Sequence, residues 1–486
     1  MSPLLILGCI GTYFCFLLLI AWRTSRNATS ASYYLGNKAS PWYAVAFGLI
    51  GDSLSGVTFI SVPGRVASAQ FSYMQVVLGY VVGYVVIAQV LLPMYYRLNL
   101  TSIYSYLQQR FGRASQKSGA FFFLLSRTTG AAARLYLAAN IIQAFVFDAW
   151  GIPFALTVSV IILLILAYTL KGGIRTLVWT DTFQSSFLIL GVVLSIWAIA
   201  RELDLDLSGI VAAVRDGGNS QVFFWDWQEK RYFWKQFLSG VSLAIVMTGL
   251  DQNMMQKNLS CRSLREAQWN IYAFTGVMLV VNALFLSLGA LLYHYAGVTG
   301  VEVPADTDKL FPLLVFQHLG IFAGIVFVAG LTAATFSSAD SVLTTLTTSF
   351  LIDFLEMDKQ AAWNERRKTV LRHQIHILFA VLLLLVILAF KALNSQAVIT
   401  AVLTLAGYTY GPLLGLFAFG LFTKAPVKDR WVPLICVAAP VLCWVLNSSS
   451  ERWLSGYQFG FELLILNGLF TFFGLWLARE RVPRTV

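Results

Sequence analysis

Long apolar runs fill this chain, and they limit its possible folds more than any other feature of the sequence. A helix needs roughly 20 apolar residues to cross about 30 Å of hydrocarbon. Only 12% of the residues are charged, whereas soluble domains carry about 25%, so 486 residues cannot be given a solvated surface. We therefore predict an all-α polytopic membrane protein with about 13 transmembrane helices. The predicted spans are about 3–22, 41–63, 73–94, 119–147, 151–170, 176–200, 233–256, 267–293, 318–351, 375–390, 398–421, 431–446 and 459–477.

The positions of the basic residues predict the orientation in the membrane. If the N-terminus lies outside, most of the 34 Lys and Arg residues fall in inward loops, with Lys257 counted among them. The positive-inside rule then places the C-terminus in the cytoplasm and the protein in the plasma (inner) membrane as a multi-pass protein. The net charge of +11 is thus a topology signal. We expect the lipid bilayer, and no nucleic acid, as a partner.

Four aspartates lie within predicted spans, where a charge is costly and usually functional. They are Asp52, Asp181, Asp251 and Asp340. Asp52 belongs to the segment GDSLSG at 51–56, and Asp251 to TGLDQN at 248–253, so glycines and polar residues interrupt both spans. Two interrupted spans five helices apart are typical of an inverted repeat whose broken helices meet at a central site.

This repeat divides the chain into five predicted parts. A peripheral helix and loop come first, then a repeat of five spans, an extracellular segment with a short helix, a second repeat of five spans, and two peripheral helices. Their ranges are 1–40, 41–200, 201–232, 233–423 and 424–486.

Oxygen atoms should gather where the broken helices meet. An unwound segment frees backbone carbonyls, which suit a hard monovalent cation. The ninth span adds hydroxyls, because Ser337, Ser341 and Thr344 recur on one helix face and Ser338 flanks it. The hydroxyls of 344–349 have an equally good structural explanation, since membrane Ser and Thr often bond to a carbonyl four residues earlier or pack helices. Asp340, with Asp181 from another span, forms either a cation cage or a proton relay.

Two arginines seven residues apart face the same way in the fourth span. Arg127 is near enough to the inner surface to extend its head group there. Arg134 should lie deeper, and so pairs either with an internal carboxylate such as Asp52 or Asp340, or with an anionic solute.

Several short motifs follow one another over nearly the whole chain. They are YTLKGGIRT at 168–176, WTDTFQ at 179–184, DQNMMQK at 251–257, ATFSS at 334–338 and GPLLG at 411–415. In their order and spacing they resemble the sodium/solute symporter family. The stretch TSIYSYLQQRF at 101–111 is most similar to the branch with iodide, monocarboxylate and vitamin carriers.

This resemblance implies the leucine-transporter type of five-plus-five inverted fold and sodium-coupled uptake by alternating access, with Na⁺ as coupling ion. The main sodium site would use backbone oxygens of Gly51, Leu54 and Ala334 with the hydroxyls of Ser337 and Ser338. A second sodium site would use Asp181, Ser337, Asp340 and Ser341. Asp340 departs from the family pattern, and it either strengthens this second site, takes a proton instead, or holds Arg134.

The resemblance also bears on the solute. Positions that contact sugar in sugar-carrying members hold Thr58, Val77, Ala244 and Met247 here, which disfavours a sugar. Sialic-acid carriers place hydroxyls where Ser53, Ser55 and Thr58 fall and use an arginine in the fourth span. Arg134 is about one turn out of that register. We predict a small organic anion, sialic-acid-like or a monocarboxylate. The candidate solute-contacting residues are Ser53, Ser55, Thr58, Arg134, Met247 and Asp52.

Other functions remain open at this level. The alternatives are a symporter for sugar or another neutral solute, proton coupling through Asp181 and Asp340, and a channel built on the same broken helices. An enzyme is not expected, because no nucleophile or metal constellation accompanies the aspartates.

Overall fold

The computed structural model describes residues 3–26, 30–360, 362–393, 396–453, 457, 459–460 and 462–480, and in that part of the chain it contains helices and no strands. Arg481 and Arg484, which belong to the predicted basic cytoplasmic end, lie outside the described residues. The helices of the first half are α1 (Pro3–Thr24), α2 (Ser30–Leu35), α3 (Trp42–Ser53), α4 (Gly56–Gly64), α5 (Val66–Ala69), α6 (Tyr73–Val86), α7 (Leu92–Arg97), α8 (Ser105–Arg110), α9 (Arg113–Ile142) and α10 (Phe154–Glu202).

The second half continues with ten more helices in the described part of the chain. They are α11 (Leu207–Asp216), α12 (Phe233–Ala244), α13 (Gln252–Asn258), α14 (Leu264–Thr299), α15 (Leu310–Gln317), α16 (Gly320–Ser349), α17 (Glu365–Leu393), α18 (Gln396–Phe422), α19 (Val432–Trp453) and α20 (Leu463–Leu477). Four π-helical segments extend or join these helices: η2 (Ile87–Leu91), η3 (Gln143–Phe147), η5 (Ile245–Gly249) and η7 (Phe350–Phe354). Short 3₁₀ turns are η1 (Gly36–Lys38), η4 (Asp148–Trp150), η6 (Thr307–Lys309), η8 (Met357–Lys359) and η9 (Asp429–Trp431).

Both predicted interruptions are present. The second span breaks after Ser53, because Leu54 and Ser55 take extended backbone angles, and its two parts meet at a bend of 60°. The seventh span breaks at Leu250 and Asp251, where Phe233–Gly249 and Gln252–Asn258 meet at 67°. The polar, glycine-containing segments read from the sequence therefore do interrupt their helices.

One long helix contains two predicted spans. α10 runs over 49 residues, but Gly173 inside it has φ 54° and ψ −150°, which divides it near the predicted boundary between the fifth and sixth spans. A side chain at Gly173 would also collide with the Tyr33 backbone. Both the positive φ angle and the lack of space therefore favour glycine at this position. By length and apolarity, seven described helices qualify as membrane spans, or up to nine with each bent pair as one. The count of thirteen stays a prediction.

A long helix rich in hydroxyl side chains occupies the centre of the bundle. Every residue of α16 from Leu331 to Ser349 is buried, although this segment carries ten hydroxyl side chains and Asp340. α10 and α9 pack against it, and α3 and α13 contact it from the broken spans. The hydroxyls therefore face protein and not lipid, which is how polar groups are tolerated at this depth.

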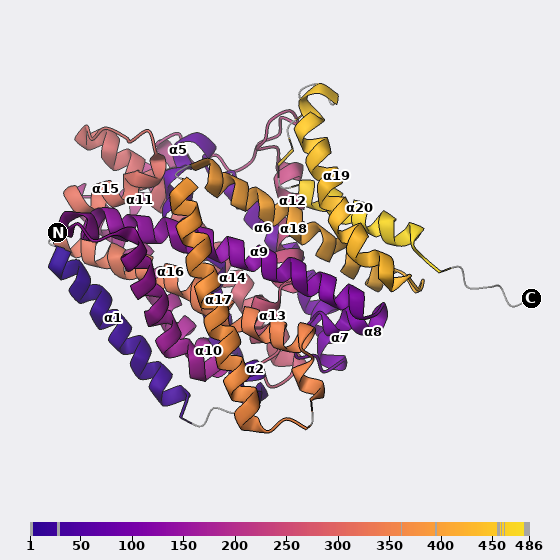
Figure 1. The fold of residues 1–486 in the computed structure, drawn as a ribbon. Coiled ribbons are helices and arrows are strands. Elements are labelled where there is room, and N and C mark those ends of the chain that lie inside the picture. The colour runs from indigo at the N-terminus through magenta and orange to yellow at the C-terminus, as the bar shows by residue number, and fades with distance from the viewer. Residues whose placement is uncertain are drawn as a thin grey trace, which may run out of the picture.

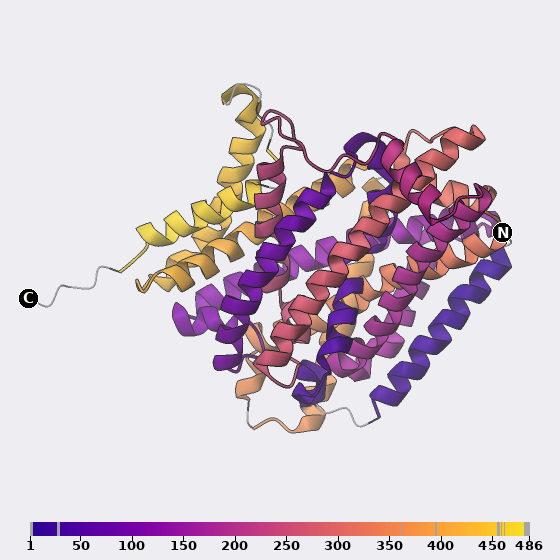
Figure 2. The same cartoon turned by 180° about the vertical axis from the view of Figure 1, so that it is seen from behind.

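Peripheral helices flank this centre on opposite sides. Figures 1 and 2 show α1 along one edge of the bundle and α19 and α20 at the other, so the two termini lie far apart. α11 lies within the predicted extracellular segment and is the short helix expected there.

We predict that the contact between α6 and α12 tolerates no added side chain. A methyl group at Gly79 would lie 2.1 Å from the carbonyl oxygen of Phe237, and one at Gly240 would lie 2.1 Å from that of Val76. Because the obstacle is backbone, Gly79→Ala should destabilise the fold by about 1–3 kcal/mol, as overpacking does. The midpoint of thermal unfolding of the purified protein measures the effect.

Gly276→Ala in α14 is the matched control, since nothing lies within 4 Å of its added methyl group. Alanine is favoured over glycine in a helix, so the control should unfold at the wild-type temperature or slightly above it. Equal midpoints for Gly79→Ala and Gly276→Ala would contradict the predicted close packing.

Candidate functional site

The broken end of α3 lies directly against the centre of α16. A methyl group at Gly51 would be 2.5 Å from Ser337 Oγ, so the two residues approach as closely as a glycine allows. Gly51 is in the last turn of α3, where carbonyl groups have no partner within the helix. Ser185 of α10 fixes this end, because its hydroxyl accepts a 2.9 Å hydrogen bond from the Gly51 backbone N–H. The broken end of α3 and the Ser337 hydroxyl are thus in close contact.

Ser337 differs from most hydroxyls of its helix. Thr344, Thr347 and Thr348 each donate to the carbonyl four residues earlier, which is the structural role expected for 344–349. The buried Ser337 Oγ has no hydrogen-bond partner among the described residues. A buried hydroxyl without a partner is costly, so Ser337 is chemically available to a ligand.

The remaining members of the predicted main sodium set are buried, and each lies within a few residues of Gly51 or Ser337 along the chain. Leu54 is the first residue beyond α3, and its side chain is buried. On α16, Ser338 Oγ donates to the carbonyl oxygen of Ala334 at 3.3 Å. This set offers only hydroxyl and carbonyl oxygens, which is the donor chemistry that a hard cation such as Na⁺ prefers.

A lysine lies between the residues of the predicted second sodium set. Lys257 of α13 is fully buried, and its ammonium group forms ion pairs with Asp52 and Asp181. It also donates a 2.7 Å hydrogen bond to Ser341 Oγ. The predicted place of Lys257 in an inward loop is wrong, because the bend at Asp251 turns α13 into the protein.

Asp340 lies beside this cluster but has partners of its own. Its Oδ2 accepts from the Tyr168 hydroxyl at 2.8 Å and its Oδ1 from the Ser341 backbone N–H at 2.6 Å. Asp340 therefore does not hold Arg134, which was one of the three roles left open for it.

The second interruption has an ion pair of its own. Arg127 Nε donates to Asp251 Oδ2 at 2.6 Å, and both side chains are buried. Asp251 also accepts from the Tyr410 hydroxyl at 2.8 Å and from the Met254 N–H at 3.2 Å, which caps α13. Arg127 therefore does not extend to the membrane surface, and that expectation was wrong.

The candidate solute-contacting residues surround the two breaks. Ser53 ends α3, Ser55 precedes α4, and Thr58 lies in the first turns of α4. Met247 lies in η5, where its carbonyl accepts from Arg127 at 3.3 Å.

The two remaining candidates differ in their partners. Asp52 forms an ion pair with Lys257 in this conformation. Arg134 of α9 is half-buried and makes no ion pair within the described part of the chain, so its predicted alternative of a bond to Asp52 or Asp340 is absent, and its other alternative, an anionic solute, stays a prediction.

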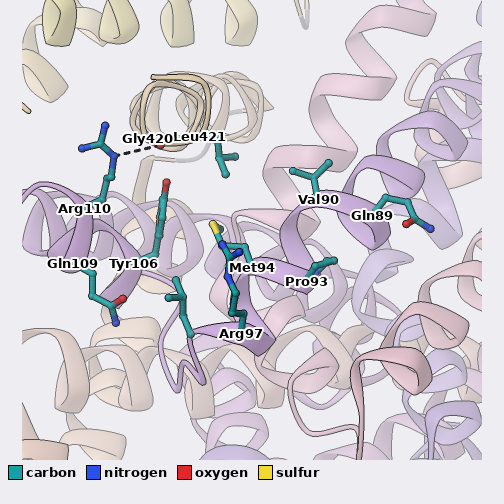
Figure 3. A pocket seen from close by; sticks show the side chains of 11 residues that line it. Gln89, Val90, Pro93, Met94, Arg97, Tyr106, Gln109, Arg110, Gly420 and Leu421 are labelled. Atoms are coloured by element: carbon teal, nitrogen blue, oxygen red, sulfur yellow. Dashed lines mark hydrogen bonds between the residues drawn. The ribbon is translucent and has the colours of Figure 1, made fainter. Parts of the chain in front are cut away.

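A pocket among the described residues lies elsewhere. It has a volume of ≈ 610 Å³ and lies between η2, α7, α8 and the end of α18. Figure 3 shows Arg110 at its rim, donating to the Gly420 carbonyl, and Arg97 and Tyr106 along its wall. None of the predicted ion or solute residues lines it, so we assign the site to the broken helices instead.

Sequence analysis missed four residues of this centre: Lys257, Ser185, Tyr168 and Tyr410. Lys257 and Tyr168 belong to the motifs at 251–257 and 168–176, but those motifs do not indicate that the two side chains are buried. Ser185 follows Asp181 by one helical turn, which puts both on one face of α10. No pattern in the sequence singles out Tyr410.

Known proteins resemble this chain over most of its length. The model of the family described as SSF, the Sodium:solute symporter family, matches residues 33–427. Sodium-coupled monocarboxylate transporter 1 of Mus musculus is 27% identical over 438 residues, which cover 86% of this chain and 67% of that protein. The sodium/sialic acid symporter NanT of Aliivibrio fischeri is 24% identical over 485 residues, which cover 95% and 90%.

Solved structures share the fold. A Na⁺-coupled sialic acid symporter in a substrate-bound outward-open state superposes with a TM-score of 0.83 at 20% identity, over 98% of this chain and 99% of that one. Mhp1, a nucleobase-cation-symport-1 family transporter, gives 0.54 at 14% identity, over 93% and 95%. The predicted all-helical fold of the leucine-transporter type is thereby confirmed.

We predict that the Arg127–Asp251 pair is essential to stability. Arg127→Met leaves a carboxylate buried without its cation, which costs about 3–5 kcal/mol. The double variant Arg127→Met with Asp251→Asn removes both charges and should recover much of that loss. Thermal unfolding of the purified variants measures both.

Arg113→Met serves as control, because it removes an ion pair to Glu356 in which the arginine side chain is 68% exposed. Such surface pairs contribute about 0–1 kcal/mol. If Arg127→Met unfolded at the same temperature as Arg113→Met, or if the double variant were the least stable, the assigned role would be wrong.

Proposed function

The chain belongs to the sodium:solute symporter family, and from this premise we propose that it imports a small organic anion together with sodium by alternating access. The observation that carries the proposal is the approach of Gly51, at the broken end of α3, to the unpartnered hydroxyl of Ser337. The proposed main ion site consists of the backbone oxygens of Gly51, Leu54 and Ala334 with the hydroxyls of Ser337 and Ser338.

The geometry suggests how sodium and solute are coupled. The proposed ion ligands come from α3, which belongs to the first broken span, and from α16, so sodium would link the two helices. Sodium then favours the conformation in which these helices are correctly apposed, and a solute bound at the same break gains affinity in proportion. A tenfold sodium gradient contributes about 1.4 kcal/mol per ion, which allows roughly tenfold accumulation of the solute. A potential of 100 mV adds about 2.3 kcal/mol only for each net charge that crosses, and one sodium ion with a monovalent anion carries none.

Two features favour an anionic solute. Arg134 makes no ion pair within the described residues and lies on α9, the helix whose Arg127 contacts the second break. A guanidinium group suits a carboxylate, because its planar donors match the two oxygens. Named relatives carry monocarboxylates and sialic acid, both of which are carboxylates. Ser53, Ser55 and Thr58 would supply hydroxyl contacts, and Met247 an apolar one.

We also propose the membrane arrangement. The N-terminus lies outside and the C-terminus in the cytoplasm of the plasma (inner) membrane, with repeats over 41–200 and 233–423. The inward-loop excess of Lys and Arg supports this orientation after Lys257 is removed from the count.

Uptake into proteoliposomes tests the function. Sialic acid, a short monocarboxylate and a neutral hexose are offered separately, each with an inward sodium gradient or with a pH gradient in sodium-free buffer. We expect one of the two acids to accumulate with the sodium gradient alone. Accumulation of the hexose would overturn the anion assignment, and accumulation driven by the pH gradient would overturn sodium coupling.

Ser337→Ala tests the ion site. Since it removes one proposed oxygen ligand, the sodium concentration for half-maximal uptake should rise about tenfold, in line with the loss of roughly 1.4 kcal/mol of binding. Ser195→Ala is the control, because Ser195 is a buried serine of α10 whose hydroxyl only donates to the Gly191 carbonyl. An unchanged sodium dependence in Ser337→Ala would remove this residue from the site.

A further inference from the structure

We propose that the ammonium group of Lys257 permanently fills the second cation position, so that this protein couples one sodium ion, and not two, to each transported solute. The inference rests on the proposed function for sodium at the main site, and it goes further by assigning the stoichiometry to one side chain.

The ammonium group is fully satisfied where it lies. A lysine side chain has three N–H donors and no acceptor. Lys257 finds three acceptors, namely Asp52 Oδ2, Asp181 Oδ2 and Ser341 Oγ. Its side chain is 1% exposed, so no water is needed to complete the set.

The oxygens that hold Lys257 are those a second sodium ion would use. Asp181 and Ser341 are two of the four residues that the family resemblance assigned to that ion, and Ser341 Oγ lies 3.3 Å from Asp181 Oδ2. A sodium ion at this point would have to share both oxygens with a cation already in contact with them. Like charges in a site of low dielectric repel strongly, so the lysine excludes the ion.

The third member of that ion set is also engaged. Both carboxylate oxygens of Asp340 accept hydrogen bonds, one from the Tyr168 hydroxyl and one from the Ser341 N–H. Ser337, the fourth member, also belongs to the proposed main site. Little of the second set is therefore left for another ion.

The fold keeps Lys257 in this position. All seven residues of α13 are buried. Gln252 bonds to the Thr101 carbonyl and the Ile103 N–H, and Gln256 bonds to the Tyr34 carbonyl. These neutral side chains hold both turns of the helix in place, so Lys257 projects from a fixed helix and not from a flexible loop.

Removing the lysine should open the site. Asp52 Oδ1 and Asp181 Oδ1 are buried and have no hydrogen-bond partner among the described residues. Without the ammonium group, two carboxylates and the Ser341 hydroxyl would surround a space of strongly negative potential. Methionine is close to lysine in length and apolar, so Lys257→Met removes the charge while largely preserving the packing of the stem.

Sodium binding to the purified full-length protein tests the proposal with sodium as the only probe. Radiolabelled sodium binding gives the number of ions per protein, and the sodium dependence of thermal stability gives the Hill coefficient. We expect one ion and a coefficient near one for the wild type, and two ions for Lys257→Met. The double variant Lys257→Met with Asp181→Asn should return to one ion, because it removes a ligand of the opened site.

Lys359→Met is the matched control, since it removes a half-exposed lysine far from this cluster in the sequence and should bind one ion. The wild-type count decides the proposal even if Lys257→Met fails to fold: two bound ions would overturn it and leave sodium coupling intact. A wild type that binds no sodium would overturn the proposed function as well. A folded Lys257→Met that still binds one ion would also contradict the proposal.

Discussion

Burying charge beside interrupted backbone is the constraint on which this structure depends. Each broken span carries an aspartate at its break, and a lone carboxylate is costly at that depth. Lys257 pairs with Asp52 at the first break, and Arg127 pairs with Asp251 at the second. Each ion pair joins elements from different parts of the chain, so the charges that make the breaks costly also connect the broken helices to their neighbours.

The hydroxyl-rich helix α16 serves two purposes. Toward its end, threonines such as Thr347 and Thr348 return their hydrogen bonds to their own helix and let polar residues pack in the centre. One turn before Asp340 the pattern changes, because Ser337 Oγ has no hydrogen-bond partner in the part of the chain that the structure describes and lies against Gly51. The structural hydroxyls and the proposed ion ligand thus follow one another along a single helix, and they differ in their hydrogen-bond partners.

Comparison of the two cation positions explains how one scaffold can couple different numbers of ions. At the first position, the proposed ligands are neutral oxygens from the end of α3 and from α16. At the second, carboxylates meet a cation that is part of the chain. Because the ammonium group belongs to the chain, no entropy is lost in binding a mobile ion there. The group still connects α3, α10, α13 and α16. On our proposal, the family's second ion is replaced by a fixed side chain.

Local pattern alone determined much of this protein. Apolar runs of spanning length predicted the helical membrane fold, and the segments around Asp52 and Asp251 predicted where two helices break, because glycine and polar residues weaken a helix wherever it lies. The pairing of charges was not predictable in the same way. The sequence leaves open whether Arg134 meets an internal carboxylate or a solute, and it places Lys257 in a loop, because one sequence does not say which helices face each other. Only the tertiary structure decided that Lys257 turns inward and Arg127 meets Asp251, since these contacts depend on how helices distant in the chain pack and on the 67° bend that delivers α13.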